Sequence, residues 1–402
     1  MRPFTSTIPL AEARRRLEAA VVPISRTESV GIAEAAGRVA AADVTSTIDV
    51  PPFARSAMDG YAVVAADTSR ASRPAPARLR LLDRIYTGQI SSVTVAPGTC
   101  AEIATGAPLP SGADAVVMVE ETAKNGESEV DIFAPATGGQ NIGRRGGDIV
   151  AGDRVVAAGD VLTPSRVGAL AATGSARVEV FARPRVAILS TGNEVVEPGQ
   201  PLGAGQIFDV NRFTLAAIVS THGGVPEPQP PAQDSLDALL TSLDACRSAD
   251  LIVFSGGSSV GERDLVVDAI AARGEMIFHG IAVRPGKPTA FAMVDGTPFF
   301  GMPGNPTSCL SNAYILLVPY LRAVARLPAH APRIVRVPLA RRIASTANRH
   351  QFYTVRLRDG VAYPAFKGSG DITSLSQSDG YIEIPADQSV VEEGTVVDVT
   401  LF

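Results

Sequence analysis

The sequence predicts a multidomain protein of the α/β plus β class, with one doubly wound α/β domain and smaller β-rich domains around it. A chain of 402 residues is too long for one compact core and indicates roughly two to four domains. Between residues 181 and 328, buried strand patterns alternate with helix patterns, which favours a parallel sheet covered by helices on both faces. Before and after this region, short apolar runs alternate with turn residues, a pattern typical of β domains.

The beginning of the chain has a helical pattern. Leu10 and Leu17 share one face of an amphipathic helix expected over Pro9–Ala20. A second helix-like piece is expected over Ser29–Gly37, and an extended stretch should follow up to Thr45.

Residues 46–142 change to short strands separated by turns, and we expect an inserted β-rich domain there. A helix is expected over residues 163–174, because Thr163 precedes a proline at the first helical position. This helix could rejoin the N-terminal helices, so we expect a discontinuous helical linker domain made of residues 1–45 and 143–180. The four strand-like runs of the insertion are 79–82, 92–95, 115–119 and 130–133.

The α/β domain is expected over residues 181–328, with buried strands at Val186–Ser190 and Leu251–Phe254. A hairpin is expected at Asp295-Gly296, where a turn dipeptide separates two apolar runs. Residues 329–402 return to short strands and should form a C-terminal β domain.

Composition excludes several classes of function. The net charge of -5 comes without long blocks of like charge, which disfavours nucleic acid and anionic membranes as partners. No run approaches the roughly 20 apolar residues of a membrane helix, and no signal-peptide pattern opens the chain, so we expect a cytoplasmic protein. The three isolated cysteines favour neither disulfides nor a thiolate metal site, and the four histidines show no ligand spacing.

Three loops follow the predicted strands of the α/β domain, at the sheet edge where ligands bind in such folds. They are Ser190–Glu194, Ser255–Asp264 and Gly301–Ser308. Their glycines allow successive backbone N–H groups to face one anion, which predicts a phosphorylated ligand. A single Gly-Gly pair is equally consistent with a plain strand-to-helix turn.

Two acidic residues accompany these loops. The carboxylates of Glu194 and Asp264 are suited to a magnesium ion that bridges to phosphate oxygens. The alternatives remain a helix N-cap for Asp264 and a solvated loop position for Glu194.

Eight segments, in order along nearly the whole chain, resemble the MoeA and gephyrin E-domain family, the molybdopterin molybdenumtransferases. The segments are Ser56–Ala62, Thr105–Ala107, Arg145–Ile149, Ser190–Glu194, Asp209–Asn211, Gly256–Gly261, Pro285–Pro288 and Pro303–Pro306.

The resemblance implies an elongated homodimer of four-part chains whose active-site cleft uses both subunits, with an α/β domain that binds molybdopterin. The implied reaction takes adenylylated molybdopterin and molybdate, cleaves off AMP with Mg²⁺, and leaves molybdenum on the dithiolene sulfurs. Molybdopterin adenylyltransferase and apo-molybdoenzymes are the implied partners.

The resemblance also implies roles for single residues. Asp59, Thr105, Asp148, Glu194 and Asp264 form the implied catalytic set, with Asp59 from the partner subunit and Mg²⁺ held by Glu194 and Asp264. The implied pterin- and phosphate-binding residues are Ser190, Thr191, Gly192, Gly256, Gly257, Ser258, Lys287, Pro303, Gly304 and Asn305. The implied molybdate-binding residues are Arg284, Lys287 and Ser369.

The sequence departs from the family pattern in the group that should bind molybdate. Arg284 and Gly280 stand where the family usually has lysines, and Gln233, beside Asp234, stands for an expected aspartate. Thr354 stands for an arginine, with Arg349 and Arg356 close to it in sequence. An alternative hypothesis is therefore a non-catalytic molybdopterin-binding or scaffold protein, and another is a transferase for a different oxyanion.

Overall fold

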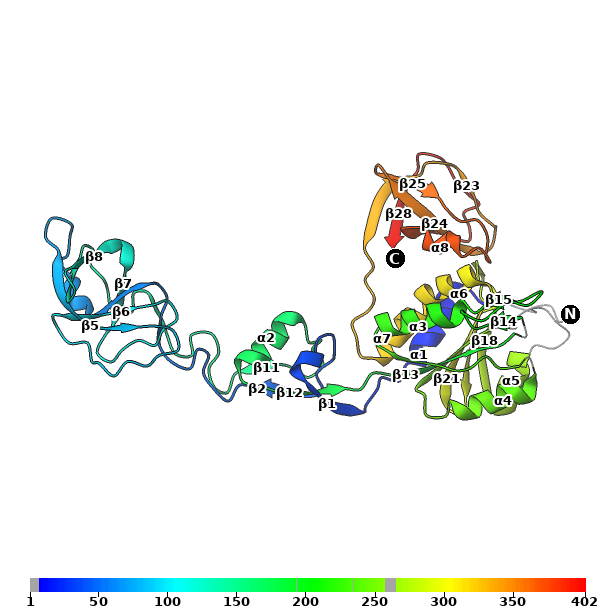
Figure 1. The fold of residues 1–402 in the computed structure, drawn as a ribbon. Coiled ribbons are helices and arrows are strands. Elements are labelled where there is room, and N and C mark those ends of the chain that lie inside the picture. Colours follow the sequence, from blue (N-terminus) through cyan, green and yellow to red (C-terminus); the bar gives the residue numbers. More distant parts are fainter. Residues whose placement is uncertain (1–6, 193, 234, 257–264) are drawn as a thin grey trace. The chain divides into compact units, whose positions relative to one another are not determined.

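The computed structural model describes residues 7–192, 194–233, 235–256 and 265–402. It divides into two compact units, one made of residues 29–180 and one made of the residues before and after that segment. Figure 1 shows the ribbon coloured along the sequence.

The unit of residues 29–180 contains a six-stranded sheet in the order β7-β4-β6-β5-β9-β8. Apolar side chains from both faces of this sheet are buried, among them Tyr61 and Ile103. Three of the four predicted runs lie in its strands, but the run at 92–95 makes only a single bridge, from Thr94 to Ser111, so that strand prediction was wrong. The strands are β4 (Gly60–Val63), β5 (Ala77–Ile85), β6 (Thr99–Ile103), β7 (Ala115–Met118), β8 (Thr122–Asn125) and β9 (Glu129–Ile132).

The remainder of this unit has one α-helix, α2 (Pro164–Ala172), which begins as predicted: Thr163 Oγ1 accepts a hydrogen bond from Arg166 N. The expected helix over Ser29–Gly37 was wrong. That segment holds part of a strand, β1 (Thr27–Gly31), and a 3-10 helix of three residues. The shorter strands are β2 (Val44–Thr45), β3 (Arg55–Ser56), β10 (Ile142–Gly143), β11 (Arg154–Val156) and β12 (Arg177–Phe181).

The second unit is centred on a sheet in the order β16-β13-β17-β21-β20-β18. The first four strands are parallel, as predicted, whereas β20 is antiparallel to both of its neighbours, β21 and β18. The hairpin expected at Asp295-Gly296 joins β20 to β21. The strands are β13 (Arg185–Ser190), β16 (Val225–Pro228), β17 (Leu251–Ser255), β18 (Gly274–His279), β20 (Ala290–Val294) and β21 (Thr297–Met302).

Helices cover both faces of this sheet, which confirms the doubly wound architecture. Along β13, Val186 and Ile188 belong to one core and Ala187 and Leu189 to the other, because successive strand residues point to opposite faces. The first core packs against α1 (Leu10–Ala19), α3 (Asn211–Thr221), α6 (Pro306–Asn312), a π-helix (Ala313–Leu317) and α7 (Val318–Val324). The second packs against α4 (Leu236–Ala245) and α5 (Leu265–Arg273).

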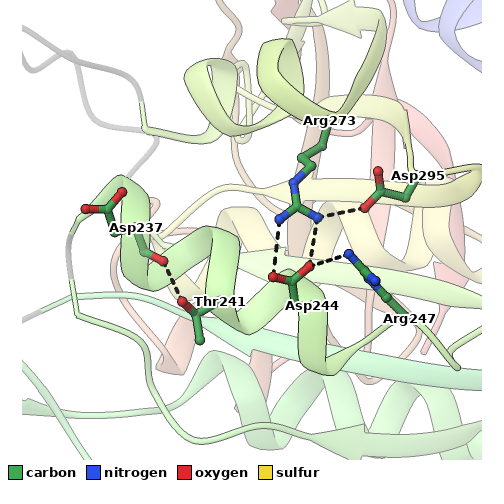
Figure 2. Close-up of polar contacts among 6 residues, drawn as sticks. All are labelled: Asp237, Thr241, Asp244, Arg247, Arg273 and Asp295. Atoms are coloured by element: carbon green, nitrogen blue, oxygen red, sulfur yellow. Dashed lines mark hydrogen bonds and ion pairs between the residues drawn. The ribbon is translucent and has the colours of Figure 1, made fainter.

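An ion-pair network joins the elements of the second core (Figure 2). Asp244 of α4 accepts hydrogen bonds from Arg273, at the end of α5, and from Arg247. Arg273 also pairs with Asp295 in the hairpin at 3.1 Å. The hydrogen bonds from Arg273 hold the pKa of the Asp244 carboxyl below its usual value.

The C-terminal β domain forms a sheet in the order β19-β24-β26-β28-β22, with β25 beside β24. Its first strand, β19 (Val283–Arg284), comes from the α/β part of the chain and pairs parallel with β24. The remaining elements are β22 (Ile334–Pro338), β23 (Ile343–Ala344), β24 (His350–Arg358), β25 (Val361–Pro364), α8 (Thr373–Ser376), β26 (Gly380–Ile384), β27 (Val390–Val391) and β28 (Val396–Leu401).

The helix α1 lies in the core of the α/β part, so the predicted first linker segment, 1–45, is shared between the two units. The finer division into four domains stays a prediction. Among the described residues, none of the helices has the length and apolarity that crossing a membrane requires.

Candidate functional site

A cleft of about 1140 Å³ lies within the second unit and is lined by the α/β part and the C-terminal β domain. The loops that follow β13, β17 and β21 form one wall. Residues 207–211, residues 283–288 and segments of the C-terminal domain between 346 and 372 also line the cleft. The site therefore stands at the carboxyl ends of the parallel strands, where the sequence placed it.

The described parts of the three predicted loops come together. Ser190 and Ser255 are directly paired across β13 and β17, which sets the first two loops side by side. A Cβ on Gly256 would lie 2.6 Å from Thr191 O, so only glycine allows this approach. On Gly304, a Cβ would lie 3.9 Å from Gly256 Cα, so the third loop is adjacent too. Gly257, Ser258 and Asp264 lie outside the described residues.

Asp209 and Asn211 hold the loops in place, a role that the sequence analysis did not give them. Asp209 is buried; its Oδ2 accepts a hydrogen bond from Ser190 Oγ at 2.9 Å, and its Oδ1 accepts one from Arg212 N at 3.0 Å. Asn211 Nδ2 donates to Ser255 Oγ at 2.8 Å and to Gly304 O at 2.7 Å. Asp209 lies just before α3 and Asn211 is the first residue of α3, so this short segment connects all three loops through its side-chain hydrogen bonds.

Glu194 is exposed and lines the cleft. Its carboxylate lies against Gly192, where an added Cβ would come within 2.8 Å of Glu194 Oε2. Two short parallel strands, β14 (Val195–Val196) and β15 (Ile207–Phe208), follow this turn and extend the lining with apolar side chains.

The segment after β19 carries Lys287 into the cleft lining. Gly286 has a φ of +101°, and its carbonyl accepts hydrogen bonds from Asn312 Nδ2 and Thr289 Oγ1, each at 2.9 Å. Because Asn312 and Thr289 are fully buried, their hydrogen bonds anchor this turn to the protein core.

Among the described residues, four basic ones line the cleft: Arg284, Lys287, Arg349 and Lys367. Ser369 lines it too, and its Oγ accepts a hydrogen bond from Asn305 Nδ2 at 3.1 Å. The three predicted molybdate-binding residues, Arg284, Lys287 and Ser369, are thus brought into one cleft. Lys367 is a basic residue that the sequence analysis missed, because a lysine in a turn has no local pattern that marks it.

Of the two arginines near Thr354, Arg349 lines the cleft, while Arg356 donates hydrogen bonds to the backbone and side chain of Gln377. Thr354 itself is buried on β24, and its hydroxyl has no hydrogen-bond partner among the residues that the structure describes. Neither Thr354 nor Gly280 belongs to the cleft lining.

Three predicted catalytic residues, Asp59, Thr105 and Asp148, lie in the unit of residues 29–180. Asp59 Oδ1 accepts hydrogen bonds from Thr105 N at 2.6 Å and Thr105 Oγ1 at 2.8 Å. These bonds, the backbone one first, hold the pKa of the Asp59 carboxyl below its usual value, so it is an anion at neutral pH. Asp148 is exposed, and its backbone N donates to Val50 O. The structure thus joins Asp59 to Thr105, and the roles of all three stay predictions.

The two carboxylates that line the described part of the cleft, Glu194 and Asp209, differ in their availability to a metal ion. Asp209 is occupied by Ser190 and Arg212, whereas no hydrogen bond or ion pair engages the Glu194 carboxylate in the described part of the chain. Within residues 7–192, 194–233, 235–256 and 265–402, no three His, Cys, Asp or Glu side chains gather into a metal-binding group. The predicted pair of Glu194 and Asp264 therefore stays a prediction.

Comparisons with known proteins cover nearly the whole chain. Residues 8–174 match the MoeA N-terminal region (domains I and II), residues 187–323 a probable molybdopterin-binding domain, and residues 336–402 the MoeA C-terminal region (domain IV).

Individual relatives agree with these matches. Molybdopterin molybdenumtransferase 2 of Mycobacterium tuberculosis is 36% identical over 396 residues, which is 96% of this chain and 97% of that protein. Molybdopterin molybdenumtransferase of Haemophilus influenzae is 32% identical over 386 residues and 94% of each chain. The crystal structure of a molybdopterin biosynthesis MoeA protein from Pyrococcus horikosii has a TM-score of 0.84 and 38% identity, over 98% of this chain and 99% of the other.

Proposed function

Because the chain belongs to the MoeA family of molybdopterin molybdenumtransferases and acts in molybdenum cofactor biosynthesis, we propose that it inserts molybdenum from molybdate into adenylylated molybdopterin. The reaction releases AMP and depends on Mg²⁺. The observation that carries this proposal is the single cleft in which three glycine-containing loops face four basic side chains.

The cleft suits the substrate in size and charge. Its volume of about 1140 Å³ exceeds that of most small-molecule sites and has room for a pterin, a pyrophosphate link and an adenosine. Backbone N–H groups of the loops at Gly192, Gly256 and Gly304 would donate hydrogen bonds to phosphate oxygens. Lys287 and Arg284 supply positive charge for the same group.

Glu194 would hold Mg²⁺ together with Asp264. Carboxylate oxygens are the ligands that this ion prefers, and the Glu194 carboxylate is exposed in the cleft and engaged by no described side chain. When bound there, a magnesium ion would neutralise negative charge on the phosphates. Asp209 does not fit this role, because its two oxygens hold Ser190 and Arg212 in place.

The protein's own groups perform the remaining work. The α/β loops bind the phosphates and position the pterin, and Asn211 holds the Ser255 and Gly304 loops together through its hydrogen bonds. The basic residues that line the cleft neutralise the negative charge of the departing AMP. Asp59, oriented by Thr105, would approach the cleft from the partner subunit of a homodimer, and Asp148 would accompany it. In the cytoplasm, a molybdopterin adenylyltransferase would supply the substrate and apo-molybdoenzymes would receive the product.

The test uses the full chain with adenylylated molybdopterin, MgCl₂ and molybdate. AMP release is followed by chromatography, and cofactor formation by the activity that an apo-molybdoenzyme regains. We expect Glu194→Gln to lower AMP release by about tenfold or more and to raise the Mg²⁺ concentration for half-maximal rate. Glu275→Gln, an exposed residue outside the cleft lining, is the matched control. Wild-type protein that binds molybdopterin but yields neither AMP nor cofactor would instead support the scaffold alternative.

A further inference from the structure

Two parallel strands in the unit of residues 29–180 end side by side. Strands β5 and β6 are parallel, and their last residues, Ile85 and Ile103, are directly opposite each other. After one further residue, each strand is followed by the same dipeptide, Thr87-Gly88 in one case and Thr105-Gly106 in the other. The register of the strands therefore sets Thr87 beside Thr105, which is one of the predicted catalytic residues.

Both Thr-Gly dipeptides lie in the middle of a tight turn, over residues 86–89 and 104–107. In each turn, the N–H of the last residue donates to the carbonyl of the first at 3.0 Å. Gly88 and Gly106 have φ values of +84° and +80°. A positive φ at the third residue is typical of a type II turn, which differs from type I in the orientation of its central peptide. Contacts from outside the turn can therefore decide which way this peptide faces.

Two hydrogen bonds fix the central peptide of the 104–107 turn. Thr87 Oγ1 donates to Thr105 O at 2.9 Å, and Gly106 N donates to Ser56 O at 2.8 Å. The carbonyl and the N–H of one peptide group are thus both held by residues outside the turn. A Cβ on Gly106 would lie 3.9 Å from Thr87 Cγ2, so the two turns are also within van der Waals reach of each other.

This peptide group begins at the residue that binds Asp59. Thr105 donates its backbone N–H and its hydroxyl to Asp59 Oδ1, at 2.6 and 2.8 Å. Ser56, which accepts the other bond of the peptide, lies in the loop that leads to Asp59, and its hydroxyl donates to Met58 O. A rotation of the peptide would break both of its bonds and change the backbone angle next to the Thr105 side chain. The hydroxyl of Thr87 therefore opposes a loss of the Asp59 contacts.

The charge state of Asp59 depends on Thr105. The hydrogen bonds from Thr105, the backbone one first, hold the pKa of the Asp59 carboxyl below its usual value, against a smaller opposing effect of desolvation. Among the described residues, no charged side chain contributes to this shift. The two turns carry no charged side chain, and the charged residues on the other segments next to Asp59 are Arg55, Glu120 and Glu121. Loosening of Thr105 should therefore raise the pKa of Asp59 toward that of a free aspartate.

We propose that Thr87 is a positioning residue for the pair of Asp59 and Thr105. Its hydroxyl fixes the central peptide of residues 104–107 and so holds Thr105 in the orientation that binds the Asp59 carboxylate. This inference rests on the proposed function, in which Asp59 takes part in the reaction, and Thr87 acts through Thr105 rather than on the substrate. Because Thr87 is exposed, loss of its hydroxyl should affect the reaction more than the stability of the fold.

The first measurement needs no turnover. The full chain is labelled with aspartate that carries ¹³C at the side-chain carboxyl, the Asp59→Asn variant assigns the Asp59 resonance, and its pH titration gives the pKa. We expect Thr87→Val, which removes the hydroxyl and keeps the shape, to raise the Asp59 pKa by about 0.5. Thr87→Ser keeps the hydroxyl and should leave the pKa unchanged. Thr241→Val is the matched control, because Thr241 is exposed in the other unit and its hydroxyl also donates to a backbone carbonyl, at 2.8 Å.

Turnover connects this hydrogen bond to the reaction. In the AMP-release assay, Thr87→Val should lower kcat by about threefold to tenfold and keep the KM for adenylylated molybdopterin within about twofold, because an orienting contact acts on the reacting state more than on binding. The acidic side of its pH–rate profile should move to higher pH by about as much as the Asp59 pKa does. Thr87→Ser and Thr241→Val should turn over nearly as the wild type does.

An Asp59 pKa that is unchanged in Thr87→Val overturns the inference, as does a Thr87→Ser variant that is impaired as strongly as Thr87→Val. A raised pKa with unchanged kcat overturns it too, because the bond would then have no consequence for the reaction. Circular dichroism and thermal unfolding check that the variants fold, and Thr87→Ala removes the hydroxyl if valine lowers the stability. Failure of the proposed function is a separate outcome, namely a wild type that releases no AMP, in which the Asp59 titration still reports on Thr87.

Discussion

Replacing Asp209 with alanine should destabilise the α/β core by about 3 kcal/mol. The Asp209 carboxylate is buried and accepts hydrogen bonds from Ser190 Oγ and Arg212 N. It is also an ion-pair partner of the Arg212 guanidinium, whose side chain is only 7% exposed. Removing one partner of a buried ion pair generally costs about 3–5 kcal/mol, because the remaining charge is left unbalanced.

The lower end of that range applies here, because Arg212 keeps a second acidic partner. Arg212 Nη2 lies 3.0 Å from Glu197 Oε1, and the Glu197 side chain is 56% exposed, which weakens but does not abolish its effect. Asp209→Asn retains the side-chain volume and one acceptor oxygen. Its expected cost is therefore smaller, about 2 kcal/mol.

Native-state hydrogen exchange of the amides in β13 and β17 measures this cost. These strands are central and buried, so their amides exchange mainly when the core opens. A loss of about 3 kcal/mol corresponds to roughly 150-fold faster exchange. Asp237→Ala is the control, since Asp237 is exposed on α4 and only its backbone carbonyl accepts a hydrogen bond, from Thr241 (Figure 2). Exchange in Asp209→Ala less than about tenfold faster than in the wild type would refute the reasoning.

Two further predictions concern stability. Gly286→Ala should lower the free energy of unfolding by about 2–4 kcal/mol, because the residue has positive φ and the new Cβ would meet the buried Asn312. Gly296→Ala is the control: its Cβ meets nothing within 4 Å, and it should lower the free energy of unfolding by only about 1 kcal/mol. Equal melting temperatures for the two variants would contradict this prediction. Burial acts to raise the pKa of Asp250, but the hydrogen bonds from Arg26 outweigh burial, and the pKa is lowered. The pair of Asp250 and Arg26 therefore stabilises the folded protein above about pH 4, and this stabilisation is lost as the pH falls through the pKa of the folded state. Asp250→Asn should therefore be less stable than the wild type by about 1 kcal/mol at neutral pH, as measured by urea unfolding. The difference in unfolding free energy between the two proteins should become smaller below about pH 4. A difference that does not change with pH would exclude the ion pair as its source.

Continuous apolar runs and turn dipeptides were sufficient to predict the centre of the α/β part. The strands β13 and β17 are buried on both faces, and such strands have a sequence signature that does not depend on their neighbours. The segment 29–37 shows the opposite case. Its alanines and glutamate favour a helix, but Val30 packs in a small core as part of β1, so a tertiary contact overrides the local propensity.

The candidate site likewise contains residues that could be predicted from the sequence and residues that could not. The loops at Ser190, Gly256 and Gly304 were predictable because each follows a strand of one sheet, and the topology of such sheets brings those ends together. Arg349 and Lys367 were not predictable as members of the cleft, because they reach it through the pairing of β19 with β24 and the bonds of Thr307. Nothing in the sequence around either residue encodes contacts that far along the chain.

The burial of Cys309 has a consequence for the proposed reaction, whose substrate carries sulfur atoms. Cys309 Sγ is 0% exposed and lies 3.9 Å from the hydroxyl of Ser255, in the cleft wall. Burial raises the pKa of this thiol to about 12, and the thiols of Cys100 and Cys246 are buried with raised pKa values as well. None of the three is a thiolate at neutral pH, so under the proposed function no cysteine thiolate of the protein competes with the dithiolene for molybdenum. Under the proposed function, the metal would therefore leave on its pterin carrier without first being released from a cysteine.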